Sequence, residues 1–203
     1  MEFLFLGFFT SLSLILAIGA QNIFVIEQGL KKQHTFLVCL ICSISDLILI
    51  FLGIFLFHYF VQYFSSTVEL IFNILLIIFL VYFISTKIKL YNKKINFNNK
   101  AEDISKFNIF LKTLGFTYLN PHVYSDTVFF LGNFSKNLIF NQKILFGIGA
   151  SLASFLFFFL IGFLSKKLSN YAKDKKIWRI INILIIVFMS ALTSKIFLDI
   201  INY

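Results

Sequence analysis

Six long apolar segments follow one another along this chain, and each is long enough to cross a lipid bilayer as a helix. A helix rises about 1.5 Å per residue, so a hydrocarbon core of roughly 30 Å needs about 20 apolar residues. The segments lack the strict alternation of outer-membrane barrel strands and are about twice as long as those strands. Because lipid offers the backbone no hydrogen-bonding partner, each segment has to be helical. The segments cover residues 3–30, 36–60, 68–86, 109–133, 144–164 and 180–201.

The composition fits lipid as the surrounding solvent and leaves no room for a separate soluble domain. The mean hydropathy is +0.90. Of the 203 residues, 59% are hydrophobic and 13% are charged, whereas ordinary soluble chains carry roughly a quarter charged residues. Spans of about 20 residues with short connections account for the whole length. We therefore predict an all-α membrane protein with one integral membrane domain over residues 1–203.

The basic residues cluster in alternate connections between the apolar segments. The formal net charge is +9, but the bases are not spread along an amphipathic face that would indicate a nucleic-acid partner. By the positive-inside rule, the connections after the first, third and fifth segments are cytoplasmic and both termini lie outside. The other two connections hold only Lys136 and Lys143. The clustered bases are Lys31, Lys32, Lys87, Lys89, Lys93, Lys94, Lys100, Lys106, Lys166, Lys167, Lys173, Lys175, Lys176 and Arg179.

A basic, asparagine-rich stretch over residues 91–108 divides the chain into two halves, 1–90 and 109–203. Its composition is typical of a flexible linker, and we expect it on the cytoplasmic side. Each half holds three apolar segments, so two halves of similar fold would have opposite orientations in the membrane. This inverted-repeat plan is common among secondary transporters. We predict two inverted three-helix repeats.

The first and fourth apolar segments are each interrupted by residues that disfavour a continuous helix. Glycine loosens a helix, while proline removes a backbone donor and disfavours helical geometry in the residue before it. Backbone groups freed inside a membrane are tolerated only beside a cavity or within protein, so the interruptions predict a site. The candidate residues there are Gly19, Gln21, Asn22, Asn120, Pro121 and His122.

Two aspartates and one lysine stand inside apolar segments, where ionised groups are costly and usually mark a transport pathway. Asp46 is close to the middle of the second segment, and Asp126 is one helical turn beyond His122. Either aspartate is alternatively a structural group that pairs with a neighbouring helix. Lys195 is either an internal counter-ion for a substrate-site carboxylate or an interfacial residue that pairs with Asp199.

The cysteine pair raises two further interpretations. Cys39 and Cys42 have the spacing of a thiol oxidoreductase, but apolar surroundings disfavour a reactive thiolate. They also lack the additional ligands of a structural zinc site. A metal-cation exporter would use the aspartates, His122 and these cysteines as ligands. The sequence has no Walker A, CxxCH or HExxH motif, so we expect no cofactor, no resident metal and coupling to an ion gradient.

Four parts of the sequence resemble the L-lysine exporter (LysE) family, in particular its lysine- and arginine-exporting branch. Their order and spacing span nearly the whole chain. The sequence departs from the family at Ala20, where proline is frequent, and this predicts a softer break in the first segment. The matching parts are Ala17 to Asn22 with Glu27 to Leu30, Ile44 to Asp46, Thr117 to Gly132, and Trp178 to Asn182 with Met189 to Lys195.

The resemblance implies a secondary active exporter of L-lysine, L-arginine or both in a bacterial inner membrane. Exporters of neutral amino acids or of a divalent metal cation are the alternatives. Asp46 or Asp126 would bind the substrate cation and return protonated, while Asn22 and Asn120 would orient substrate at the interruptions. The partners would be the amino acid, protons or another coupling ion, and the lipid bilayer. Small residues between Gly147 and Ser154 would form a helix interface, within one chain or in a homo-oligomer.

Overall fold

The computed structural model describes residues 1–16, 19–63, 66–92, 105–170 and 175–201, and within these ranges the chain forms helices and no strand. The all-α prediction is therefore confirmed. Most of the predicted linker, residues 93–104, lies outside the described ranges. The elements are α1 (Glu2–Ile15), α2 (Ala20–Lys31), α3 (Thr35–Tyr63), α4 (Ser66–Asn92), α5 (Lys106–Tyr118), α6 (Pro121–Tyr124), the π-helix η1 (Ser125–Phe130), α7 (Leu131–Ser135), α8 (Phe140–Leu168) and α9 (Lys175–Ile201).

Several of these helices have the length and hydropathy that a membrane crossing requires. Thr35–Phe57, Phe140–Leu168 and Arg179–Leu198 qualify as single helices. The pair α1 and α2 qualifies jointly as one broken span, with a bend of 82° between the two helices. The apolar part of α4, Asn73–Ser85, is shorter, and the fourth predicted segment is divided among α5, α6, η1 and α7. The chain is thus a multi-pass membrane protein, and the total of six crossings stays a prediction.

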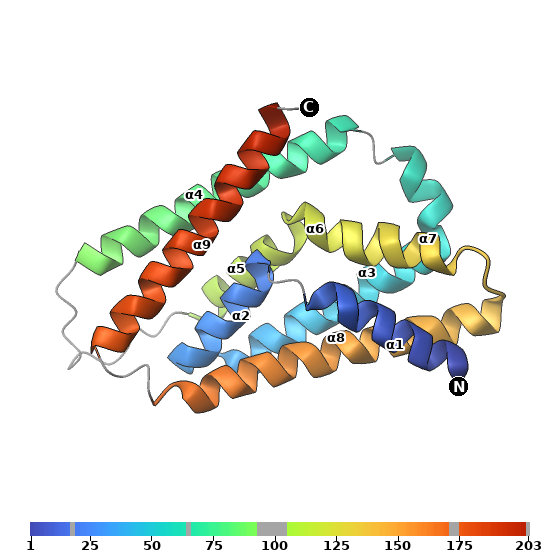
Figure 1. Ribbon diagram of the computed structural model, residues 1–203, viewed down its shortest axis with the longest axis horizontal. Helices are drawn as coiled ribbons and strands as arrows, with labels where there is room; N and C mark the ends of the chain where they lie inside the picture. The colour runs from blue at the N-terminus through green and yellow to red at the C-terminus, as the bar shows by residue number, and fades with distance from the viewer. Residues whose placement is uncertain (17–18, 64–65, 93–104, 171–174, 202–203) are drawn as a thin grey trace.

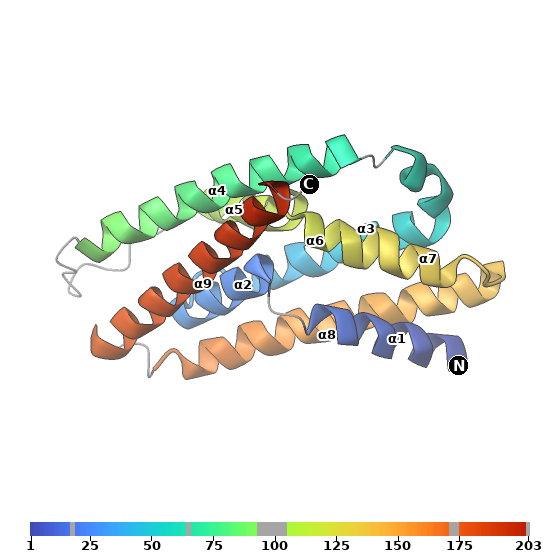
Figure 2. The same ribbon diagram turned by 45° about the horizontal axis from the view of Figure 1, so that its top comes forward.

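The chain runs back and forth along the long axis of the molecule, as Figures 1 and 2 show. α2 ends and α3 begins at the same end at which α8 ends and α9 begins, and a hydrogen bond of 3.5 Å from Lys32 Nζ to Asn170 Oδ1 joins these connections. We call this the lysine-rich end, because Lys31, Lys32, Lys166 and Lys167 all lie there. Sequentially distant basic connections thus share one end, as predicted, and their cytoplasmic location stays a prediction.

The centre of the molecule is the antiparallel pair α3 and α8. α1 and α2 pack on α8, whereas α5, η1 and α7 pack on α3, and α4 packs against α9. If each helix is replaced by its counterpart in the other half, the packing of α1 and α2 on α8 becomes the packing of α5, η1 and α7 on α3. The pairs α3–α8 and α4–α9 stay the same. A two-fold pseudo-symmetry axis produces this pattern. The inverted repeat stays a prediction that this arrangement supports.

The small residues of the fifth segment pack inside the chain. The two glycines Gly7 and Gly149 mark the crossing of α1 over α8, where a Cβ on either one would collide with backbone atoms of Phe146 or Leu4. Ala150, Ala153 and Ser154 of the same face are fully buried. Close approach of helix backbones is the usual role of small residues in membrane bundles. Large apolar side chains cover the outward faces, among them Leu156, Leu160 and Leu164 on α8.

Candidate functional site

A cavity lies where the two interrupted segments meet beside α3. Its volume is about 50 Å³, which is room for a few water molecules and less than an amino acid occupies. We call it the central cavity. Both intramembrane aspartates line it, so the structure joins two residues that the sequence separates by nearly half its length. The lining residues are Ser11, Leu14, Ile15, Gln21, Asp46, Val123, Asp126, Thr127 and Leu131.

Asp46 is fixed in the wall of this cavity by a neighbouring helix. It lies in α3 and is 4% exposed, and its Oδ2 accepts a hydrogen bond of 2.7 Å from Ser154 Oγ on α8. The second carboxylate oxygen, Oδ1, is buried and forms no hydrogen bond of standard geometry in the described part of the chain, although the Gln21 amide is close to the carboxylate. A buried acceptor of this kind is costly unless a donor reaches it. Asp46 therefore offers one oxygen toward the cavity.

Asp126 enters the cavity from a different kind of element. It lies in the π-helix η1, is half-buried, and is close enough to Asp46 for the two carboxylates to interact electrostatically. A π-helical turn widens the backbone spiral, and here Thr127 Oγ1 donates a hydrogen bond of 2.6 Å to the Val123 carbonyl. Consecutive residues Asp126 and Thr127 both line the cavity as a result. Such turns are often found at functional sites.

The first interruption is closed by side-chain amides. Gly19 has an extended backbone and is the N-cap of α2, and a Cβ placed on it would have open space. Asn22 Nδ2 donates a hydrogen bond of 3.0 Å to the carbonyl of Ile15, at the end of α1. Gln21 Nε2 donates a hydrogen bond of 3.2 Å to Thr117 Oγ1 of α5. The two helices α1 and α2 meet at a bend of 82° with Ala20 at the start of α2, and the softer break than in relatives with proline stays a prediction.

The second interruption is closed by capping. Asn120 is 3% exposed, and its Oδ1 accepts a hydrogen bond of 3.2 Å from the backbone N–H of His122. Pro121 is the first residue of α6, a position whose backbone N–H has no partner within a helix, so the N–H that proline lacks is not needed. His122 is exposed and, like Asn120, is not among the described residues that line the cavity, while the Pro121 side chain lies outside the description.

The structure does not bring the remaining candidates into the cavity. Lys195 is on α9, which packs against α4 and contributes no described residue to the cavity lining, and the Lys195 side chain itself lies outside the description. Cys39 and Cys42 are buried, and Cys39 Sγ donates a hydrogen bond of 3.2 Å to the Phe158 carbonyl. Across the described residues, no group of three or more His, Cys, Asp or Glu is arranged to hold a metal ion.

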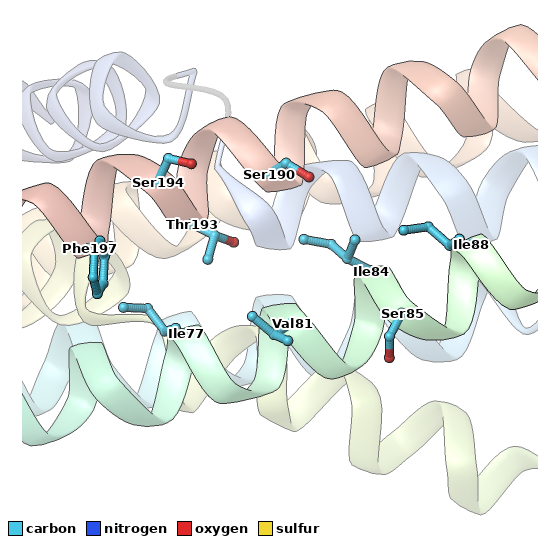
Figure 3. Close-up of a pocket in the computed structure, with 9 residues that line it drawn as sticks. All are labelled: Ile77, Val81, Ile84, Ser85, Ile88, Ser190, Thr193, Ser194 and Phe197. Carbon is cyan, nitrogen blue, oxygen red and sulfur yellow. The ribbon is translucent and has the colours of Figure 1, made fainter.

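A larger space lies between α4 and α9 and differs in chemistry from the central cavity. Its volume is about 540 Å³, and Figure 3 shows Ile77 and Ile84 of α4 opposite Thr193 and Phe197 of α9. Its described lining is aliphatic and aromatic with four hydroxyl groups, and holds no charged side chain. A charged substrate would lose its hydration there without a compensating partner. The central cavity is therefore the better candidate.

Sequence reasoning missed several polar residues around the aspartates. Ser154 was noted only as a small packing residue, while Thr117 was noted only as part of a motif and Thr127 was not singled out. A lone hydroxyl in an apolar segment usually bonds to its own helix, as Thr127 does. Only the packing of α8 on α3 and of α5 on α2 shows that Ser154 and Thr117 reach groups on other helices.

Comparison with known proteins gives one family. The model of the LysE type translocator family matches residues 12–199. The arginine exporter protein ArgO of Salmonella paratyphi A is 33% identical over 191 residues, which cover 93% of this chain and 90% of the relative. The same identity and coverage apply to the arginine exporter protein ArgO of Salmonella typhimurium and of Salmonella newport. No solved structure matches the chain.

Proposed function

This chain belongs to the LysE type translocator family, and from this premise we propose that it exports L-arginine, with L-lysine as a second substrate, across a bacterial inner membrane. As a family member it is a transporter and not an enzyme, so Cys39 and Cys42 serve packing and not thiol chemistry. The proposed substrate follows the arginine exporters that share 33% identity with the chain.

The observation that carries the proposal is the pair of carboxylates in one cavity. Asp46 is 4% exposed, its Oδ1 forms no hydrogen bond of standard geometry with the described residues, and Asp126 lines the same space. A guanidinium or ammonium group supplies the missing donors together with a compensating charge, and charge-assisted hydrogen bonds are about twice as strong as neutral ones. A neutral amino-acid side chain would leave both carboxylates uncompensated. The lining thus favours a cationic substrate.

The interruptions provide the second half of the proposed site. Substrate binding would open the small cavity toward Gly19 to Asn22 and toward Asn120 to His122. The N-terminus of α2 presents backbone N–H groups there, and such half-helix ends bind substrate carboxylates in other transporters. Asn22 and Asn120, which now hold the interruptions in place, would orient the amino-acid group.

Export of a cation needs an energy source, because the membrane potential opposes it. Moving one positive charge outward costs about 2.3 kcal/mol per 100 mV of inside-negative potential. We propose exchange for protons at the aspartates: a carboxylate binds the substrate cation on the cytoplasmic side, releases it outside, and returns protonated. The lysine-rich end faces the cytoplasm in this scheme, as the positive-inside rule predicts.

Efflux from preloaded cells tests the proposal. Cells with and without the protein are loaded with labelled arginine or lysine from a dipeptide source, and efflux is followed before and after collapse of the proton gradient. We expect protein-dependent arginine efflux that stops when the gradient collapses. Efflux that persists without the gradient would contradict proton coupling. Efflux of neutral amino acids or resistance to metal cations, without arginine efflux, would overturn the substrate assignment.

A further inference from the structure

The contact between α2 and α5 separates the central cavity from the lysine-rich end. The two helices are antiparallel and touch at successive levels. Gln21 Nε2 and Thr117 Oγ1, 3.2 Å apart, meet at the level of the cavity. One turn further out, the rings of Phe24 and Phe116 stack with their centroids 4.6 Å apart. Any path from the lysine-rich end to the cavity along these two interrupted segments passes this contact.

An aromatic cluster closes the middle level of this contact. Phe24 is 1% exposed and Phe116 is fully buried. Phe79 and Phe83 of α4 meet the Phe116 ring edge-on, at centroid distances of 4.8 and 5.0 Å. We call these four residues the aromatic plug. The plug excludes water and ions, so a charged substrate has to shift it before it can reach Asp46.

A buried ion pair lies on the outer side of the plug. Glu27, one turn beyond Phe24 on α2, is 1% exposed and is paired with Lys31, whose side chain is 21% exposed. Lys112 of α5 is close enough to interact electrostatically with both of them. Gln28, next to Glu27, is 2% exposed, and its Oε1 forms no hydrogen bond with the described residues. A buried carboxylate is thus held between the two halves by tethered cations.

We propose that Glu27 is a first docking site for the cationic side chain of the substrate, and that Lys31 is a tethered competitor that occupies this carboxylate when no substrate is bound. This inference rests on the proposed function. A guanidinium binds a carboxylate with two parallel hydrogen bonds, which an ammonium cannot do. Exchange of the partly exposed Lys31 for an arginine side chain keeps Glu27 compensated throughout. Removal of one partner without replacement would instead leave an uncompensated buried charge, a strongly destabilising change.

The exchange brings the substrate to the outer side of the aromatic plug. The Glu27–Lys31 pair lies within α2, so arginine that replaces Lys31 is bound one turn outside Phe24 and close to Lys112 of α5. A neutral amino acid has no charge to exchange for that of Lys31. The outer site therefore selects for charge before the substrate reaches Asp46 and Asp126.

Uptake of labelled arginine into everted membrane vesicles, which expose the cytoplasmic face, tests the proposal. We expect Glu27→Gln to raise the half-saturating arginine concentration about tenfold, the effect of losing a charge-assisted pair. Lys31→Gln removes the competitor but leaves Lys112 as a cation close to Glu27, so it should lower that concentration by roughly threefold. Lys32→Gln is the matched control, because it removes a charge from the neighbouring position, which bonds to Asn170 and not to Glu27. It should leave the concentration unchanged.

The opposite changes expected in the half-saturating concentration distinguish a docking site from a purely structural ion pair. If Glu27→Gln and Lys31→Gln both lower protein abundance or both raise the half-saturating concentration, the pair is structural and the proposal is wrong. Citrulline, the neutral analogue of arginine, should not inhibit wild-type uptake at large excess but should inhibit the Glu27→Gln variant. If the wild type takes up no arginine at all, the proposed function fails first. Wild-type uptake with an unaltered Glu27→Gln variant overturns only the docking site.

Discussion

The two halves of the chain contribute to the central cavity in different ways. The first half supplies Asp46 and Gln21, which are both nearly fully buried. Each is hydrogen-bonded to a residue of the second half, Asp46 to Ser154 and Gln21 to Thr117. The second half supplies Asp126 and Thr127 from a π-helix, and Asp126 is only half-buried. One side of the cavity is therefore fixed by contacts with other helices, while the other side lies on a backbone of irregular geometry.

This difference suggests a division of labour between the two aspartates. Asp46 sits on the uninterrupted helix α3 and is positioned by Ser154, so it suits a permanent binding group. Asp126 lies between the Asn120 cap and the return to α-helix at Leu131. A π-turn can relax to α-helical geometry with a change in side-chain direction, so Asp126 suits the group that moves during transport.

Charge removal at the aspartates should give the largest effects. We expect Asp46→Asn to reduce arginine efflux at least about a hundredfold and Asp126→Asn about tenfold, because truncation of a buried charge pair costs more than truncation of a partly exposed one. Efflux per unit of membrane-embedded protein is the measurement. Asp126→Glu should retain part of the activity, whereas Asp46→Glu should not, since the longer side chain moves the carboxylate away from the Ser154 hydroxyl that positions it. Wild-type efflux from Asp46→Asn at equal abundance would rule out an essential role.

Two glycine substitutions compare the crossing of α1 over α8 with the interruption of the first apolar segment. Gly149→Ala places a methyl group against the Leu4 backbone, so we expect a loss of about 3 kcal/mol in stability and several-fold lower abundance in the membrane. Gly19→Ala meets open space with an extended backbone, so its stability should stay within about 0.5 kcal/mol of wild type. Thermal unfolding of the purified protein in detergent measures both. Equal destabilisation would contradict the close crossing of α1 over α8.

The hydrogen bond from Ser154 to Asp46 can be tested separately from the charge. Ser154→Ala should weaken arginine transport about tenfold, the effect of losing a bond to a charged group. The expected change is in the half-saturating concentration, with abundance maintained. Ser151→Ala is the control, because Ser151 is equally buried on α8 and its hydroxyl has no partner among the described residues. A similar loss in both variants would show that the effect is one of packing.

The asparagines that close the interruptions should have the smallest effects. Asn120→Ala removes the cap on α6, and Asn22→Ala removes the donor to the Ile15 carbonyl, each at a cost of about 1 kcal/mol in stability. Asn120→Ser keeps an oxygen acceptor and should be nearly neutral. Melting temperatures of the three variants make the comparison. A severe loss of transport in Asn120→Ser with normal stability would place Asn120 in direct contact with substrate.

Much of the fold follows from local features of the sequence. The apolar segments predicted the helices, and the interruptions at Gly19 to Asn22 and at Asn120 to His122 coincide with the starts of α2 and α6. The basic connections that alternate along the sequence, those after α2 and after α8, lie together at the lysine-rich end. These features are local because lipid requires each segment to satisfy its own backbone hydrogen bonds. The π-helix η1 was not predicted, since its sequence has no feature that distinguishes it from an α-helix.

The sequence by itself determined that the chain is helical, spans a membrane, carries two intramembrane aspartates and breaks two of its segments. Only the tertiary structure decided that Asp46 and Asp126 share one cavity, that Ser154 fixes Asp46, and that His122 is exposed and not among the described lining residues. The physical reason is that hydrogen bonds within a helix depend on near neighbours, whereas the groups around a buried charge come from helices far apart in the chain. Their identity depends on how α3, α5 and α8 pack together.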